Sequence, residues 1–298
     1  MRPFTYLCPR TIDEATAMLG REGALPIAGG TDLVVQMKAG LISPRYLVDM
    51  TKLGLAYIRE EEGSLRIGAA TTLEDVSASE AVRRSVSVLA EAAGQIGSVQ
   101  TRCLATIGGN LCSGVPSADT APALLVLSAQ MHIVGPRGAR VVPIQEFFLG
   151  PRQTVVCNDE LLIDIEVPVQ PPHAGWSFLK LGRRKAMTLA VVNAAALLWL
   201  TEEGDIIQGI RIAVGAVAPT PLRALRAESS LQGCSASQAI IDVASNRVVD
   251  EIAPIGDVRA TAEYRRTTSS VIVNRALVQA WHRATEKDAH PYGVPNPA

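Results

Sequence analysis

The chain has 298 residues, of which 48% are apolar, and its 28 basic and 29 acidic side chains give a formal net charge of −1. This length allows one large or two ordinary domains with a substantial core, while the balanced charge excludes nucleic acid as the main partner, because neutralising phosphates requires a basic surface. The best candidate for a membrane span, residues 189–200, is too short to cross a bilayer, and residues 1–15 lack the apolar core of a signal peptide.

The first part of the chain alternates between helix and strand patterns. Residues 11–20 begin with a Thr–x–x–Glu capping pattern and end at a glycine, which predicts a short helix. Residues 24–30 read as an apolar strand running into a pair of glycines, and a helix capped by Thr31 or Asp32 is expected next. Residues 56–71 alternate on both sides of a Glu-Gly turn, which is typical of a hairpin.

The alternation continues through the middle of the chain. Thr72 and Asp75 form the start signal of another helix, residues 87–97 have the pattern of a helix that ends at a glycine, and residues 121–129 predict a helix with a proline in its first turn. Strand patterns then follow at residues 130–135, 139–144 and 160–168.

The character of the sequence changes around residues 167–175, where three prolines, a histidine and a glycine mark a linker or a domain boundary. Beyond it come strand patterns and then helix patterns, at residues 176–182, 189–201, 206–218, 220–233, 236–252 and 261–285. Strands followed by helices indicate an α+β arrangement. We therefore expect one domain over residues 1–172, a second over 173–287 and a tail over 288–298.

Two glycine pairs stand at turns that lead into helix patterns, Gly29-Gly30 in "PIAGGTDLVVQMK" and Gly108-Gly109 in "ATIGGNLCSG". Free amides at the start of a helix, together with the helix dipole, bind anions. Either pair alone is compatible with a purely structural turn, but two of them favour a shared diphosphate ligand. Neither pair belongs to a P-loop or to the GxGxxG fingerprint of dinucleotide-binding folds.

Asp119 lies nine residues after Asn110 and directly before an apolar helix pattern. It can cap that helix or accept hydrogen bonds from ribose hydroxyls, and the two roles are compatible. The five cysteines form no CxxC-like pair, which argues against disulfides, zinc and iron–sulfur clusters in this chain and predicts a reducing, cytoplasmic location. Hydrolase and metalloprotease motifs are absent from the sequence.

The segments "AGGTDLVVQMKAG" and "TIGGNLCSGVPSADTAPALL" resemble the FAD-binding medium subunit of molybdenum hydroxylases, a group that includes the carbon monoxide dehydrogenase medium chain and the flavin domain of xanthine dehydrogenase. The resemblance continues in order through "ELLIDIEVP", "FLKLGRRKAM", "AVVNAAALL" and "EYRR", so it covers nearly the whole chain. It implies an α+β fold. Residues 1–172 would form a two-lobed FAD-binding domain of the PCMH/vanillyl-alcohol oxidase type with two α/β subdomains. Residues 173–287 would form a C-terminal domain of antiparallel sheet and helices, like that of CO dehydrogenase flavoproteins.

The resemblance also implies an FAD site. Both glycine loops would surround the diphosphate, Asp119 would contact the sugar portion, Ile96 and Leu162 would flank the adenine, and Lys180 would lie near the flavin. The expected cofactor-binding residues are Ile27, Ala28, Gly29, Gly30, Thr31, Asp32, Leu33, Ile96, Thr106, Ile107, Gly108, Gly109, Asn110, Asp119, Leu162 and Lys180. Binding is expected to be non-covalent, and neither catalytic side chains nor metal ligands are expected in this chain.

The sequence departs from the family pattern after "RR", where relatives often carry an acid and this chain has Thr188, so the contacts near the flavin ring stay open. The cysteine-rich insertion of the 4-hydroxybenzoyl-CoA reductase branch is absent.

The resemblance implies an electron-transfer subunit of a molybdenum-dependent oxidoreductase, with FAD passing electrons from a small [2Fe–2S] subunit to an external acceptor. A large molybdopterin subunit would complete a heterotrimer, doubled by a two-fold axis. The alternatives are a stand-alone FAD-dependent oxidase or reductase and a non-enzymatic nucleotide-binding assembly protein.

Overall fold

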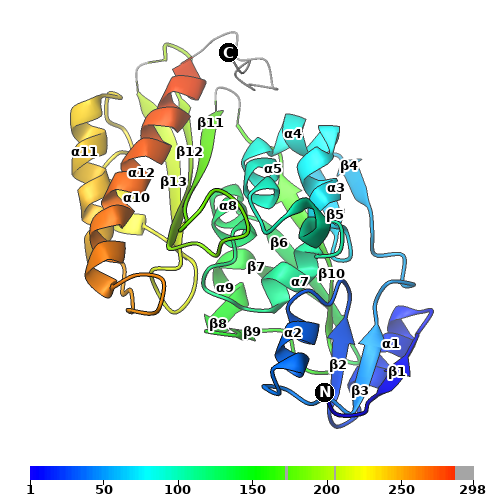
Figure 1. The fold of residues 1–298 in the computed structure, drawn as a ribbon. Coiled ribbons are helices and arrows are strands. Elements are labelled where there is room, and N and C mark those ends of the chain that lie inside the picture. The colour runs from blue at the N-terminus through cyan, green and yellow to red at the C-terminus, as the bar shows by residue number, and fades with distance from the viewer. Residues whose placement is uncertain (172–173, 205, 286–298) are drawn as a thin grey trace.

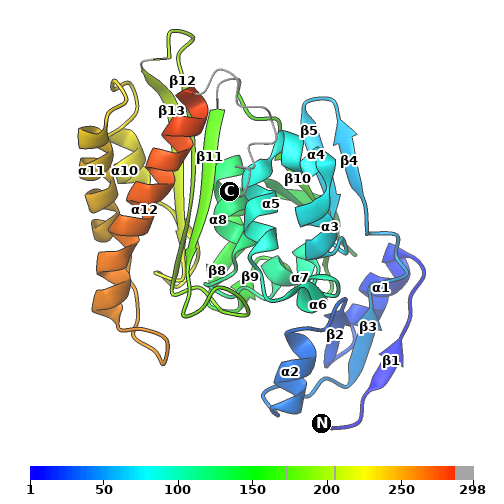
Figure 2. The same cartoon turned by 45° about the horizontal axis from the view of Figure 1, so that its top comes forward.

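The computed structural model describes residues 1–171, 174–204 and 206–285 (Figure 1). Three main sheets follow one another along the chain: a small parallel sheet, a five-stranded antiparallel sheet and a four-stranded antiparallel sheet. Figure 2 shows the small parallel sheet projecting from one end of the molecule, while helices fill the space between the two larger sheets. The predicted α+β class, with two lobes followed by an antiparallel sheet with helices, is confirmed.

The N-terminal lobe is built on the parallel sheet, in the order β1-β3-β2. Its elements are β1 (Thr5–Leu7), α1 (Ile12–Leu19), β2 (Ala24–Ile27), α2 (Leu33–Lys38) and β3 (Tyr46–Asp49). Thr11 caps α1 as predicted, because its side chain accepts a hydrogen bond from the Glu14 amide. The predicted side-chain cap of α2 is wrong: Asp32 occupies the cap position, but its carboxylate accepts a hydrogen bond from the Gln36 side chain instead.

The second lobe is built on the antiparallel sheet β4-β5-β10-β6-β7. Its strands are β4 (Ile58–Glu61), β5 (Ser64–Gly68), β6 (Gln130–Gly135), β7 (Gly138–Pro143) and β10 (Leu161–Pro168). The predicted hairpin of β4 and β5 is confirmed, and Gly63 adopts a φ of +78° at its turn. A short pair of strands, β8 (Phe148–Gly150) and β9 (Gln153–Thr154), lies beside this lobe and was not predicted.

Helices of the second lobe cover one face of its sheet (Figure 1). They are α3 (Leu73–Ala78), α4 (Glu80–Ser85), α5 (Ser87–Gly94), α6 (Val99–Arg102), α7 (Ile107–Cys112), α8 (Thr120–Leu127) and α9 (Ile144–Phe147). Helix α5 ends three residues before the predicted Gly97. Every residue of α8 is buried, because this helix contacts β10 on one side and strands of the next sheet on the other.

The C-terminal unit is an antiparallel sheet in the order β11-β12-β13-β14, with helices packed on its outer face (Figure 1). Its elements are β11 (Ala174–Leu181), β12 (Val192–Leu200), β13 (Ile207–Gly215), β14 (Leu222–Arg223), α10 (Leu225–Ser229), α11 (Gln238–Arg247), a 3₁₀ turn (Val248–Asp250) and α12 (Ala262–Thr285). The helix predicted over residues 220–233 is wrong in its first part, since β14 pairs with β13 there. Tertiary pairing of the sheet edge overrides the local helix pattern.

Strand β12 is buried on both faces, which explains its nearly continuous apolar sequence. Ala194, Ala196 and Leu198 pack toward α12, whereas Ala195 and Leu197 belong to the core of the second lobe. The sheet is therefore shared between a C-terminal core and the core under the predicted site. The predicted boundary at residue 172 and the tail over 288–298 lie outside the described residues.

Candidate functional site

The first glycine loop connects β2 to α2 and rests directly on the chain that leads into the second loop. A Cβ atom on Gly29 would lie 1.7 Å from the carbonyl oxygen of Leu104, which is two residues before Thr106. Gly30 has a φ of +67°, a conformation that L-residues rarely adopt. The structure thus brings the two predicted loops together, as a shared ligand requires.

The first loop carries a run of unpaired backbone donors. The N–H groups of residues 29–33 find no acceptor among the described residues. The next amide, that of Val34, donates to the Gly30 carbonyl at 3.0 Å and begins the hydrogen bonding of the helix. Successive N–H groups around a left-handed glycine form a concave cradle for anions. This loop has the donor geometry that a diphosphate needs.

The second loop differs, because the amides of residues 107–110, at the start of its helix, all have acceptors. Thr106 caps α7, because its Oγ1 accepts a hydrogen bond from the Gly109 amide at 3.1 Å. The Gly108 amide donates to the Ala69 carbonyl at 2.9 Å, and the Asn110 amide donates to the Thr106 carbonyl at 2.9 Å. The expectation of free amides at both turns is therefore wrong for the second one, whose helix start is satisfied internally.

The two glycines of the second loop have different surroundings. Gly108 is buried, and a Cβ there would lie 2.6 Å from the Ala69 carbonyl oxygen, so packing requires glycine. Gly109 is exposed, its φ is not positive, and a Cβ would meet only the Thr106 Oγ1 atom, at 3.0 Å. Glycine early in a helix costs stability relative to alanine. Neither packing nor backbone conformation accounts for Gly109, and its open face is where a ligand can lie against the backbone.

Asp119 and Lys180, which are 61 residues apart in sequence, form a buried ion pair. The Lys180 Nζ atom donates to Asp119 Oδ2 at 2.5 Å and to the Gln95 carbonyl at 3.1 Å, so it lies beside the predicted Ile96. Asp119 stands at the start of α8 without a side-chain cap bond, and its other oxygen accepts a hydrogen bond from Asn193 Nδ2 at 2.7 Å. The capping role weighed for Asp119 is thus wrong, and an inward network takes its place.

Burial raises the pKa of the Asp119 carboxyl, and its contacts with Lys180 and Asn193 lower that pKa again only in part. Asp119 is 4% exposed, and its contacts with Lys180 and Asn193 favour its charged form. Removing one partner would leave an uncompensated buried charge. This loss would destabilise the fold by more than the intact pair stabilises it.

The remaining predicted residues near the ion pair of Asp119 and Lys180 either connect to it by hydrogen bonds or belong to the core. The side chain of Asn110 accepts a hydrogen bond from Thr120 Oγ1 at 2.6 Å, which ties the second loop to the residue after Asp119. Ile107 is fully buried, so its side chain belongs to the core. Ile96 and Leu162 pack against the same core cluster, Leu162 from β10 and Ile96 from the chain after α5.

Asn193 and Gly215 are not among the residues predicted from the sequence. Asn193 is fully buried in β12 and lies directly opposite Lys180 on one side and Gly215 on the other. The signal was present in "AVVNAAALL", where one amide interrupts an apolar strand pattern. A buried amide in a strand needs a polar partner, and only the fold shows that this partner is Asp119.

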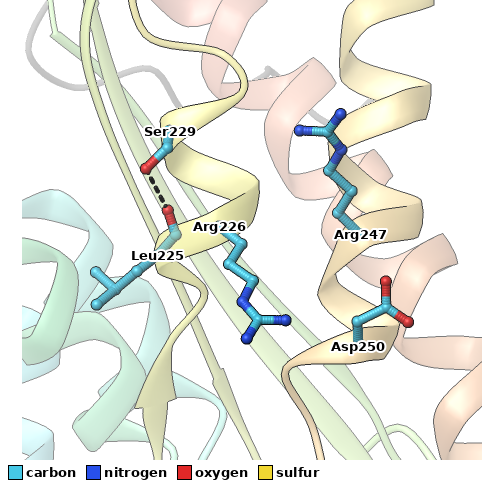
Figure 3. Close-up of a pocket in the computed structure, with 5 residues that line it drawn as sticks. All are labelled: Leu225, Arg226, Ser229, Arg247 and Asp250. Atoms are coloured by element: carbon cyan, nitrogen blue, oxygen red, sulfur yellow. Dashed lines mark hydrogen bonds between the residues drawn. The ribbon is translucent and has the colours of Figure 1, made fainter.

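A separate hollow of about 530 Å³ lies on the outer face of the C-terminal unit, between α10 and the end of α11. Figure 3 shows Arg226 and Arg247 extending from these facing helices, with Asp250 below Arg247 and Ser229 bonded to the Leu225 carbonyl. None of the predicted cofactor-binding residues lines it.

Within the described part of the chain, no cluster of three or more histidine, cysteine or acidic side chains has the arrangement of a metal site. The same residues contain no helix with the length and apolar character of a membrane span.

The fold and the paired loops define a flavoprotein subunit with an FAD-binding domain and a separate C-terminal sheet domain. Residues 2–170 match the family model for the FAD-binding domain of molybdopterin dehydrogenases, and residues 177–280 match that for the C-terminal domain of CO dehydrogenase flavoproteins. The chain belongs to the family of FAD-binding medium subunits of molybdenum hydroxylases.

Similar proteins agree along nearly the whole chain. The carbon monoxide dehydrogenase medium chain of Hydrogenophaga pseudoflava is 34% identical over 283 residues, 94% of this chain and 98% of that protein. A putative xanthine dehydrogenase FAD-binding subunit of Escherichia coli is 35% identical over 85% of this chain and 89% of its own length. The carbon monoxide dehydrogenase structure from H. pseudoflava superimposes with a TM-score of 0.92 at 34% identity, covering 95% of this chain and 99% of that one. These relatives make this chain an oxidoreductase subunit that binds FAD.

Proposed function

We propose that the chain is an electron-transfer subunit, which receives electrons from a small [2Fe–2S] subunit and delivers them through its non-covalently bound FAD to an external acceptor. The observation that carries this proposal is the convergence of a free-amide cradle at residues 29–33 with the open face of Gly109, a glycine that packing does not require. A backbone surface of this kind suits close approach by a diphosphate.

The residues present fit the parts of FAD. Free amides of the first loop would bind the diphosphate, Gly109 would allow its close approach, and Asp119 would face the sugar portion. Lys180 would hold a positive charge near the ring, where it favours a negatively charged reduced form. FAD, when bound, supplies the exchange between one-electron and two-electron carriers that such a subunit needs.

Two apolar side chains, the partly buried Ile96 and the buried Leu162, are proposed to flank the adenine. Ile96 and Leu162 offer apolar surface from two different elements of the same lobe. The rest of the expected set, from Ile27 to Leu33 and from Thr106 to Asn110, would shape the two loops, with Ile107 acting from the core.

An apolar surface beside the site is proposed to dock the [2Fe–2S] subunit. Val99 begins α6 and Leu104 follows it, while Met187 and Leu189 lie in the loop after β11; all four residues are more than half exposed. The Met187 amide donates to the Gly97 carbonyl at 3.1 Å, so the loop and α6 are neighbours. Exposed apolar groups gathered at one place are typical of a protein interface.

We further propose that a large molybdopterin subunit completes a heterotrimer, and that two heterotrimers pair about a two-fold axis. We also propose that the chain divides into an FAD-binding domain over residues 1–172 and a C-terminal domain over residues 173–287. A cytoplasmic location is proposed as well, and the five free cysteines support it.

Co-expression of the chain with the two partner subunits tests the proposal. The expected product is one stable complex with about one FAD per copy of this chain, and acid precipitation should release that FAD into the supernatant. Reduction of the isolated chain by an organic substrate would instead favour a stand-alone oxidoreductase. A chain that binds nucleotides but whose bound flavin accepts no electrons from the complex would favour an assembly protein.

A further inference from the structure

The amide of Asn193 is only half satisfied in a fully buried place. Its Nδ2 atom donates to Asp119 Oδ1 at 2.7 Å, while its Oδ1 atom has no hydrogen-bond partner among the described residues. The orientation follows from chemistry, because two oxygens facing each other could not form a hydrogen bond. A half-satisfied buried amide costs stability, so its presence indicates a role that packing alone does not supply.

The position of Asn193 follows from strand geometry. Side chains alternate along β12, and Asn193 falls on the same face as Ala195 and Leu197, toward the core of the second lobe. Lys180 on β11 is its direct cross-strand partner. Asp119 approaches this face from the start of α8 and contacts both side chains, so the three groups form one continuous network.

Gly215 on β13 completes the row as the other cross-strand partner of Asn193. A Cβ atom at this position would lie 2.3 Å from Asn193 Oδ1. Its φ is not in the left-handed region, so backbone conformation does not demand glycine here. The space above Gly215 is what allows the amide to reach Asp119.

We propose that Asn193 is a positioning residue of the FAD site, which keeps Asp119 charged and held in place between Lys180 and the cofactor, with Gly215 providing the room. This inference rests on the proposed function of the site. Asn193 acts through its hydrogen bond to Asp119.

The surroundings of Asp119 indicate that its contacts with Lys180 and Asn193 determine the charge state of its carboxyl group. Lys180 from β11 is the charged group that contacts the carboxylate, and the donor from β12 is neutral. Charged side chains on the other elements packed against α8 are bonded elsewhere or exposed. Those with other partners are Glu91 of α5 with Arg283, Asp164 and Glu166 of β10 with Arg66, Arg211 of β13 with the Val126 carbonyl, and Arg223 of β14 with Glu228, while Glu146 of α9 is exposed.

The test is the pH dependence of FAD binding to the full-length apoprotein, measured by flavin fluorescence quenching. In the unsubstituted protein the affinity should fall as the pH drops through the pKa of Asp119. In Asn193→Leu the midpoint should move to higher pH by about one unit or more, because the lost hydrogen bond favoured the charged carboxylate. Asp119→Asn should remove the transition, and Asn193→Leu should then add no further shift.

A control variant separates this effect from the loss of any hydrogen bond between an asparagine amide and a carboxylate. Asn274 on α12 donates to Asp242 on α11 at 2.8 Å, and Asn274→Leu removes a similar bond away from the site. It should leave the midpoint unchanged. Gly215→Ala provides a second variant should Asn193→Leu fail to fold, and its added methyl group should displace the amide and shift the midpoint in the same direction.

The possible results distinguish a failure of the proposed function from a failure of the inference about Asn193. An unsubstituted protein that binds no FAD at any pH overturns the proposed function and this inference with it. FAD binding with an unshifted midpoint in both Asn193→Leu and Gly215→Ala overturns the inference alone. An equal shift in Asn274→Leu also overturns it, because the effect would then be a general loss of stability.

Discussion

Replacing the exposed glycine of the second loop should separate stability from cofactor binding. In Gly109→Ala the added Cβ meets only Thr106 Oγ1, at 3.0 Å, and that neighbour must shift by a few tenths of an ångström. The helix gains about 0.5–1 kcal/mol from alanine, part of which this contact offsets. We expect the free energy of unfolding to stay within about 1 kcal/mol of the original value.

The same methyl group should weaken FAD binding strongly. A ligand in contact with the glycine backbone would be displaced by roughly 1 Å, which is enough to break a charge-assisted hydrogen bond worth about 1.5–3 kcal/mol. This corresponds to an increase of about 10- to 100-fold in Kd. Gly109→Val, with a bulkier side chain, should lose binding altogether.

Gly108→Ala is the matched control, because its Cβ would lie 2.6 Å from the Ala69 carbonyl oxygen. Overpacking of this kind costs about 1–3 kcal/mol, so stability should fall in this variant. Urea unfolding of the apoproteins and FAD titration measure the two quantities independently. Unchanged FAD affinity in a folded Gly109→Ala protein would refute the assignment of this face to the ligand.

Two further predictions concern ionic contacts outside the loops. Glu160 accepts hydrogen bonds from Arg140 and from the Cys157 amide, which lower its pKa from 4.5 to about 2, so it stabilises the fold above pH 4.5 and this contribution is lost as the pH falls toward 2. Glu160→Gln should therefore cost about 1–2 kcal/mol at pH 7 and almost nothing near pH 2, and an equal loss at both values would count against the argument. Arg265 is 2% exposed and donates to the Val191 and Ala216 carbonyls at 2.7 and 2.8 Å. Arg265→Met should destabilise the protein by about 3–5 kcal/mol in urea unfolding, and a loss below 1 kcal/mol would show that these carbonyls find other donors.

Local signals in the sequence were sufficient for much of the fold. The capping pattern at Thr11 and the Glu-Gly turn at Gly63 each depend on neighbours within a few residues, and both are confirmed. Strand β14 could not be predicted in the same way, because its pairing with β13 depends on the completed sheet edge. The helix pattern of residues 220–233 gave no sign of that edge.

The candidate site shows the same division. The glycine pairs were visible in the sequence, but whether an amide is free depends on acceptors such as the Ala69 carbonyl, which is 39 residues from Gly108. Asp119 was visible from its place before a helix pattern, whereas Lys180 was predicted only through the family resemblance, and the ion pair between them depends on the fold. Asn193 escaped notice because its partner is 74 residues away and comes close only through packing of α8 on the sheet.

The most direct test of the central claim is anaerobic rapid mixing of the reduced, isolated [2Fe–2S] subunit with this chain loaded with oxidised FAD. We expect the flavin absorbance to bleach while the iron–sulfur absorbance returns to its oxidised form, and both changes to disappear when the chain carries Gly109→Val. A stable complex of the two subunits in which the flavin stays oxidised would contradict the assignment of this chain as the electron-transfer subunit.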